Sequence, residues 1–246
     1  MSTEYAVVAG ATGALGHAIL RRLRDAGLTV VAVARSVDEL AGEPGVIPVA
    51  GDLGDDGVTA AVARAVDGPV RMLVQAAGLP ATGNVDTITG AEIARSMDIK
   101  LGGFLRLIHA VESRFVQGAR IVVLGGHYGF EPSPAVPMAG MANAALMSLV
   151  RSLADRWGPA GVTVHLVAPG PVESPRMQTV AERTAAREGG VTADEVLDRY
   201  RAASPLGRLT TIDEVAWAVG ILLAPEATAL HGSTLSLDAG RRRGIG

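Results

Sequence analysis

The chain contains no cysteine, few aromatic residues and no long hydrophobic run. Its 246 residues include 0 cysteines, and Phe, Trp and Tyr together make up 3%. The lack of cysteine excludes disulfides and thiolate catalysis and is consistent with a reducing compartment. No apolar stretch approaches the roughly 20 residues that a membrane-spanning helix needs. The amino terminus does not resemble a signal peptide. We therefore expect a soluble cytoplasmic protein with no membrane partner.

The charges are nearly balanced, and this excludes another class of partner. The chain has 25 acidic and 22 basic residues, a net charge of −3 and a pI of about 6.0. This balance offers no electrostatic footprint for nucleic acid. Hydrophobic residues reach 48%, so a large core is available and disorder is excluded. No metal site is expected, because four of the histidines are scattered without ligand spacing: His17, His109, His165 and His231.

Short strand-like runs alternate with helix-like segments along the chain. The expected strands cover residues 5–9, 29–34, 46–50, 72–75, 120–124, 162–167 and 234–237. The expected helices cover residues 14–26, 58–66, 91–115, 138–157 and 212–223. Continuous apolar strands indicate burial on both faces, as in parallel sheets. We predict an α/β fold in which residues 1–246 form a single Rossmann-type dinucleotide-binding domain. Its doubly wound parallel sheet has about seven strands, with helices on both faces.

The segment 173–205 departs from this alternation. Residues 176–203 contain two charged helical patterns separated by Gly189 and Gly190. An excursion of this length usually covers a site, so we interpret it as a mobile helical lid over the carboxyl ends of the strands. Glu173 and Arg176 are candidates for contacts with a polar substrate. The alternative is a surface helical hairpin with no gating role. Residues 241–243, three consecutive arginines, are interpreted as a solvated tail.

A glycine-rich loop follows the first expected strand. Gly10, Gly13 and Gly16 stand at three-residue spacing before a helix. Glycine permits the tight turn and lets backbone N–H groups approach a pyrophosphate, which the helix amino terminus favours. The position of the loop at the first strand–helix junction makes the pattern specific for a dinucleotide. A glycine-rich turn without a ligand is the alternative.

The end of the second strand indicates which dinucleotide is bound. A carboxylate at this position would accept a hydrogen bond from the adenosine ribose, but the chain has Arg35 there. A guanidinium suits a 2′-phosphate, so we expect NADP(H) rather than NAD(H). A solvated surface charge is the alternative. Further residues expected at the cofactor are Thr12, Leu15, Asp52, Leu53, Ala77, Gly78 and Asn143.

These segments together resemble the short-chain dehydrogenase/reductase family over essentially the full chain. The resemblance is carried by the glycine loop, Asp52, QAAG (75–78), KLGGF (100–104), APGPVESP (168–175), the run 205–225 and GSTLSLDAG (232–240). It implies a nicotinamide-dependent oxidoreductase acting on a small carbonyl, hydroxyl or enoyl compound. It also implies that Pro169, Gly170 and Val172 contact the nicotinamide end, and that the protein is a homodimer or homotetramer.

The catalytic positions depart from the family pattern of Asn, Ser, Tyr and Lys. Alignment of the flanking residues places Lys100, Gly126, Ala139 and Asn143 at these four positions, and Val136 at the wider tyrosine spacing of the enoyl reductases. Loss of a positioned general acid reduces the rate about 10²- to 10⁴-fold. Carbonyl reduction by the standard mechanism is therefore expected to be severely impaired, whereas dinucleotide binding is not.

Three residues are candidates for replacing this machinery. Lys100 is the only lysine among the 22 basic residues, and a desolvated lysine can release a proton where arginine cannot. His127 and Tyr128 follow the missing serine at the end of the fifth strand, where such sheets bind ligands. Ordinary pocket lining is the alternative for both. Two other functions stay open: a non-redox cyclase, isomerase or lyase, and a catalytically silent subunit in a hetero-oligomer with a competent paralogue.

Overall fold

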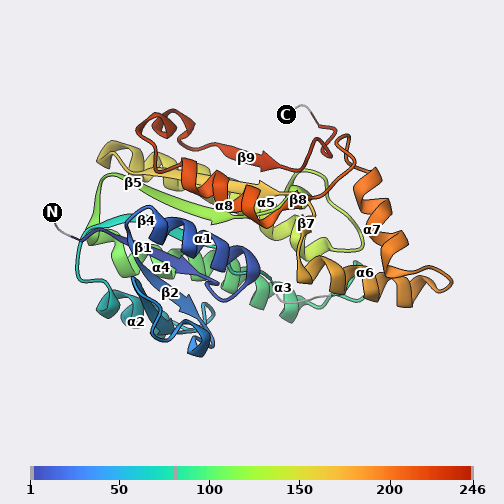
Figure 1. The fold of residues 1–246 in the computed structure, drawn as a ribbon, viewed down its shortest axis with the longest axis horizontal. Coiled ribbons are helices and arrows are strands. Elements are labelled where there is room, and N and C mark those ends of the chain that lie inside the picture. The colour runs from blue at the N-terminus through green and yellow to red at the C-terminus, as the bar shows by residue number, and fades with distance from the viewer. Residues whose placement is uncertain (1–2, 80–82, 245–246) are drawn as a thin grey trace.

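The computed structural model describes residues 3–79 and 83–244, and its centre is one parallel sheet (Figure 1). Seven strands lie in the order β3-β2-β1-β4-β5-β6-β9, and every neighbouring pair is parallel. The predicted fold class is confirmed. The strand order reverses between β1 and β4, and ligands of such sheets bind outside the carboxyl ends at this switch point. The strand bounds are β1 (Tyr5–Ala9), β2 (Thr29–Ala34), β3 (Val46–Ala50), β4 (Val70–Gln75), β5 (Phe115–Leu124), β6 (Thr163–Pro169) and β9 (Thr234–Leu237).

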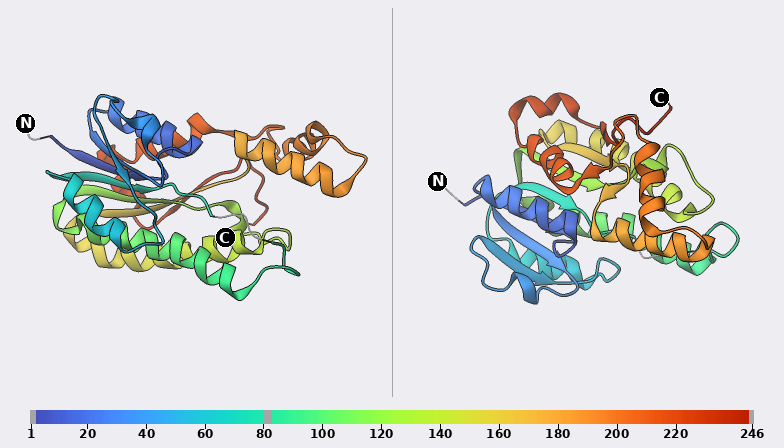
Figure 2. Two further views of the ribbon diagram at one scale, coloured as in Figure 1. Left: turned by 90° about the horizontal axis from the view of Figure 1, so that it is seen from below. Right: turned by 45° about the vertical axis from the view of Figure 1, so that its right-hand side comes forward.

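Helices cover both faces of the sheet (Figure 2). On one face, α1 (Ala14–Asp25) and α8 (Ile212–Ile221) pack over the sheet, and on the other lie α2 (Gly57–Ala65), α4 (Gly103–Val111) and α5 (Pro137–Trp157). Successive residues of β1 point to opposite faces of the sheet. Ala6 and Val8 belong to the hydrophobic core under α1 and α8, whereas Val7 and Ala9 belong to the core under α2, α4 and α5. This is the period of two expected for a strand buried on both sides, so the strand reads as a continuous apolar run.

The prediction of a single helix over residues 91–115 is wrong. The chain instead forms α3 (Gly90–Met97), a π-helical turn (Asp98–Gly102), α4 and a short 3₁₀ turn, and Phe115 already belongs to β5. The apolar period of 3.6 continues through the wider turn, so the sequence pattern does not reveal it. Phe115 pairs with Val70 and packs edge-on against Trp157, with ring centroids 5.2 Å apart. Tertiary packing therefore decides the end of this helix.

The expected pair of charged helices is present as α6 (Pro175–Glu188) and α7 (Ala193–Ala202). They project beyond the sheet at the carboxyl ends of its strands (Figure 1). A small apolar cluster joins them, and it includes Met177, Ala181, Val196 and Leu197. The base of this lid segment is fastened by two short paired strands, β7 (Val172–Glu173) and β8 (Thr210–Thr211). Gating by the segment stays a prediction.

The expectation of a solvated arginine tail is wrong for Arg241 and Arg242. The Arg241 guanidinium donates to the Tyr200 carbonyl over 3.2 Å and lies 5.4 Å from the centre of that ring. The Arg242 guanidinium lies 4.2 Å from the ring centre of Phe130. The Asp238 carboxylate accepts backbone N–H bonds at this turn and directs the tail back onto the lid. Among the described residues, no helix is long and apolar enough to cross a membrane.

Candidate functional site

A cleft of about 470 Å³ opens at the switch point of the sheet. The glycine loop forms one wall. Gly10 has φ +77°, and a Cβ there would lie 2.7 Å from the Ala77 backbone nitrogen. A Cβ on Gly16 would lie 2.0 Å from the Gly10 carbonyl oxygen. These two positions therefore require glycine. Eight of the residues expected at the cofactor line this cleft: Gly10, Thr12, Gly13, Arg35, Asp52, Leu53, Ala77 and Gly78.

The amino terminus of α1 faces the cleft without a cap of its own. Gly13 is the N-cap residue, and it supplies no side-chain hydrogen bond. The first turn also contains no acidic residue. The first N–H groups of a helix lack intrahelical partners and carry a partial positive charge, so they attract a phosphate. The loop and the helix together fit the pyrophosphate of a dinucleotide.

Three arginines border this cleft. Arg35 lies exposed at the end of β2, Arg95 comes from α3, and Arg176 comes from the first turn of α6. None of the three makes a hydrogen bond or ion pair with another described residue. The three arginines therefore bring positive charge without an acidic partner to a cleft in which Asp52 is the acidic lining residue among those described. This is the charge that a 2′-phosphate requires.

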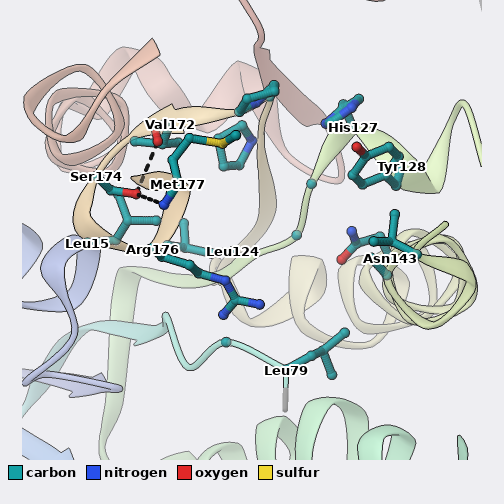
Figure 3. Close-up of a pocket in the computed structure, with 18 of the residues that line it drawn as sticks. Leu15, Leu79, Leu124, His127, Tyr128, Asn143, Val172, Ser174, Arg176 and Met177 are labelled. Atoms are coloured by element: carbon teal, nitrogen blue, oxygen red, sulfur yellow. Dashed lines mark hydrogen bonds between the residues drawn. The ribbon is translucent and has the colours of Figure 1, made fainter. Parts of the chain in front are cut away.

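A second cavity, of about 340 Å³, adjoins the cleft at Ala76–Leu79 and runs beneath α6 (Figure 3). Loops after β4, β5 and β6 form its walls together with α5 and the lid segment. Arg176 borders both spaces, and Figure 3 shows its side chain extending into the cavity. Pro169, Gly170 and Val172, which were expected at the nicotinamide end, line this second space, as do Leu15 and Asn143, which were expected at the cofactor. Gly16 lines neither space and serves the packing of the loop.

Lys100 lies in the π-helical turn and is buried in the wall of the cavity. Its side chain is 4% exposed. The ammonium donates to the Ala77 carbonyl over 2.9 Å and to Gln75 Oε1 over 3.3 Å. Burial lowers the pKa of Lys100 to about 7, and the charge of Arg176 adds to the effect. The amine therefore exchanges a proton near neutral pH. Gln75, at the end of β4, was not expected to orient it.

His127 and Tyr128 also line the cavity (Figure 3). Their rings lie 4.0 Å apart, tilted by 37°. Burial lowers the pKa of His127, with a further contribution from the Arg241 charge, and its imidazole donates to the Pro169 carbonyl. Burial raises the pKa of Tyr128, whose side chain is hydrogen-bonded to that of Tyr200. The tyrosine is therefore a neutral donor and the histidine is uncharged at neutral pH.

The remaining positions aligned with the family's catalytic residues also face this cavity. Gly126, Ala139, Asn143 and Val136 all line it. Gly126 and Ala139 bring no hydroxyl group. Asn143 is 6% exposed, and its Nδ2 would lie 3.0 Å from a Cβ on Gly126. The asparagine amide thus lies close to the position of the expected serine side chain.

Sequence reasoning missed contributors from both lid helices. Tyr200 of α7 and Met177 of α6 both line the cavity. Each lies on the inner face of an amphipathic helix, and only the fold shows which helix face meets the cavity. Glu173 lines neither space and instead pairs with Arg201 at 3.9 Å. Among the residues that the structure describes, no group of three His, Asp or Glu side chains is arranged to hold a metal ion.

Comparison with known proteins identifies the class. The chain belongs to the short-chain dehydrogenase/reductase family of oxidoreductases, as expected from the sequence. A family model described as enoyl-(acyl carrier protein) reductase matches residues 10–242. The short-chain reductase protein NovJ of Streptomyces niveus is 32% identical over 254 residues, which cover 97% of this chain and 94% of NovJ.

Solved structures give the same result. A short-chain dehydrogenase of Burkholderia cenocepacia J2315, in complex with NADP, is 25% identical with a TM-score of 0.82 and covers 96% of each chain. YwfH, an NADPH-dependent reductase involved in bacilysin biosynthesis, has a TM-score of 0.90 and covers 99% of this chain and 100% of its own. At 22% identity the second likeness is one of fold.

Proposed function

We propose that this protein is an NADP(H)-dependent oxidoreductase that acts on a small carbonyl, hydroxyl or enoyl compound through a non-standard active site. The observation that carries the proposal is the position of Lys100. Its buried amine lies in the wall between the dinucleotide cleft and the second cavity, held by Ala77 and Gln75. A group able to gain or lose a proton near neutrality is what the missing tyrosine would otherwise supply.

The chain's own residues support the choice of cofactor. Gly10, Gly13 and the uncapped start of α1 would hold the pyrophosphate, and Arg35 would bind the 2′-phosphate. Asp52 lies on the same cleft, in place for the adenine edge. Of two solved structures with the same fold, one is a complex with NADP and the other is of an NADPH-dependent reductase. When bound, such a cofactor supplies or accepts a hydride.

The polar side chains around the cavity have different roles in the reaction. In the direction of reduction, protonated Lys100 donates its proton to the substrate oxygen, and in the direction of oxidation the neutral amine accepts it. Tyr128 keeps its own proton and can orient the substrate oxygen when its single O–H turns from Tyr200 to the substrate. His127 holds the Pro169 loop, and Asn143 is placed to bond a ribose hydroxyl. The lid helices exclude water from this space.

A single-turnover experiment tests the proposal. Protein in excess is mixed with NADPH and a panel of aldehydes, ketones and enoyl esters, and NADPH absorbance at 340 nm is followed. We expect loss of absorbance that disappears in the Lys100→Met variant. Silence across the panel contradicts an oxidoreductase. Product formation without any change in NADPH would instead indicate the non-redox class of enzyme.

The second candidate is a catalytically silent subunit, and one observation favours it. Gly126 and Ala139 bring no hydroxyl to the cavity, and Asn143 brings no amine. A chain of this fold can still bind a competent paralogue, in place of the homodimer or homotetramer that we otherwise propose. Co-purification with a paralogue that retains Ser, Tyr and Lys, with turnover only in the mixed complex, would support it. Turnover by the purified homo-oligomer would exclude it.

A further inference from the structure

Two basic side chains approach the same backbone turn. The Lys100 ammonium donates to the Ala77 carbonyl over 2.9 Å. Arg176 Nη1 would lie 2.7 Å from a Cβ placed on Gly78, so the guanidinium rests against that glycine. Ala77–Gly78 is also where the dinucleotide cleft meets the second cavity. Both charges therefore lie at the junction of the two spaces.

Neither cation has an acidic partner among the described residues. Arg176 makes no hydrogen bond or ion pair there, and Lys100 contacts only a neutral carbonyl and the Gln75 amide. Glu173, three residues before Arg176, pairs instead with Arg201 at 3.9 Å. Arg176 and Lys100 consequently repel each other, and an anion bound between them would remove that repulsion.

The other residues that line the cavity indicate the polarity of the rest of the ligand. Among the described residues that line it, none is acidic. Most of its surface is apolar, with contributions from Val136, Val172, Met177 and Val180. A ligand that satisfies the whole space has a negative group at the Ala77–Gly78 end and an apolar body beneath the lid.

We propose that Arg176 forms a carboxylate-binding subsite beside Lys100 and that the substrate is an oxo acid with an apolar body. The inference rests on the proposed function and names its substrate class. The Arg176 guanidinium binds the carboxylate through a planar pair of donors. Lys100 donates to the neighbouring carbonyl oxygen. Arg176 thereby becomes a specificity-determining residue. The other source of the same anionic chemistry is the pyrophosphate of the dinucleotide, because Arg176 also borders the cleft.

The test compares two probes that share one carbonyl, benzoylformate and its uncharged methyl ester. Each is titrated calorimetrically into protein saturated with NADP⁺, which cannot reduce it, and each is then assayed with NADPH. The variant is Arg176→Gln. The matched control is Arg183→Gln, an exposed arginine on the same helix that lines neither space. The affinity of every protein for NADP⁺ is measured separately.

We expect the wild type and Arg183→Gln to bind benzoylformate at least about tenfold more tightly than the ester, and Arg176→Gln to lose that preference. Equal affinity for acid and ester in the wild type overturns the inference, even if both are reduced. Weaker NADP⁺ binding in Arg176→Gln with an unchanged preference also overturns it, because the pyrophosphate is then the anion. Preferential binding of the acid without NADPH oxidation upholds the subsite and contradicts the proposed oxidoreductase.

Discussion

The dinucleotide cleft and the adjoining cavity are built in different ways. The cleft is lined by the loops after β1 to β4, by α3 and by Arg176, so nearly all of its residues precede residue 100. The cavity combines residues from Leu15 to Tyr200, and its walls come from distant loops, α5 and both lid helices. The cleft has the glycines, the uncapped helix and the free arginines that a dinucleotide needs. In the cavity, Gly126 and Ala139 bring no hydroxyl group.

The difference shows that binding and chemistry place separate demands on this fold. A phosphate site depends on backbone N–H groups and glycine, so substitutions at the cavity leave it intact. A proton-handling site depends on a few side chains, and it can be rebuilt from another element of the fold. The buried amine of Lys100, which lines this cavity, has a pKa of about 7. Each region can be perturbed by substitution while the other serves as the reference.

Replacing the lysine has the largest expected effect. Lys100→Met removes the proton donor and fills the site with an apolar side chain of similar length. Turnover is expected to fall about 10²- to 10⁴-fold, with little change in NADP(H) affinity. Steady-state kinetics and fluorescence titration of NADPH measure the two quantities. A variant with normal turnover would show that Lys100 only supports the Gln75–Ala77 backbone.

A substitution in the cleft is expected to change cofactor affinity rather than turnover. Arg35→Glu places a carboxylate where the 2′-phosphate would bind, so the dissociation constant for NADPH should rise about 10- to 100-fold. The dissociation constant for NADH should change little, because a carboxylate accepts a hydrogen bond from a ribose hydroxyl. Arg64→Glu makes the same charge change on the exposed surface of α2, outside both spaces, and controls for net charge. Equal losses for both cofactors would remove Arg35 as the basis of selectivity.

The pH dependence follows from the lowered pKa of Lys100. Burial disfavours the charged amine, and its pKa is about 7. Reduction uses the protonated form, so its rate should fall as the pH rises through this value, reaching about tenfold per unit at higher pH. Oxidation uses the neutral form and should rise over the same range. Initial rates between pH 5.5 and 9.5 measure both profiles. A rate that stays constant over this whole range would assign the proton to Tyr128 instead, because burial raises the pKa of that side chain.

A smaller effect is expected from the tail that holds the lid. Arg241→Ala removes the contacts to the Tyr200 carbonyl and ring. A cation–π contact at a partly exposed site contributes about 0.5–1 kcal/mol, so the KM of the substrate should rise about two- to fivefold. The kcat should stay nearly constant. Tyr200→Phe is the matched variant, because it keeps the ring and loses only the side-chain hydrogen bond with Tyr128. A fall in kcat alone for Arg241→Ala would contradict a role in holding the lid.

The glycine spacing, the apolar runs and the strand–helix alternation were sufficient to predict the sheet, both lid helices and eight residues of the cleft. These are local signals, because a strand, a helix and the turn between them are encoded by neighbouring residues. Four features were not predictable in this way: the π-helical turn that carries Lys100, the strand start at Phe115, the packed tail at Arg241 and the entry of Tyr200 into the cavity.

The amino-acid sequence alone determined the family, the dinucleotide cleft and the presence of a lone lysine near the switch point of the sheet. The tertiary structure determined the environment of that lysine and therefore its pKa. Its low pKa arises from burial by residues far away in the chain and from the charge of Arg176 on the lid. Desolvation and electrostatic repulsion act through space, so a pattern of neighbouring residues cannot encode them.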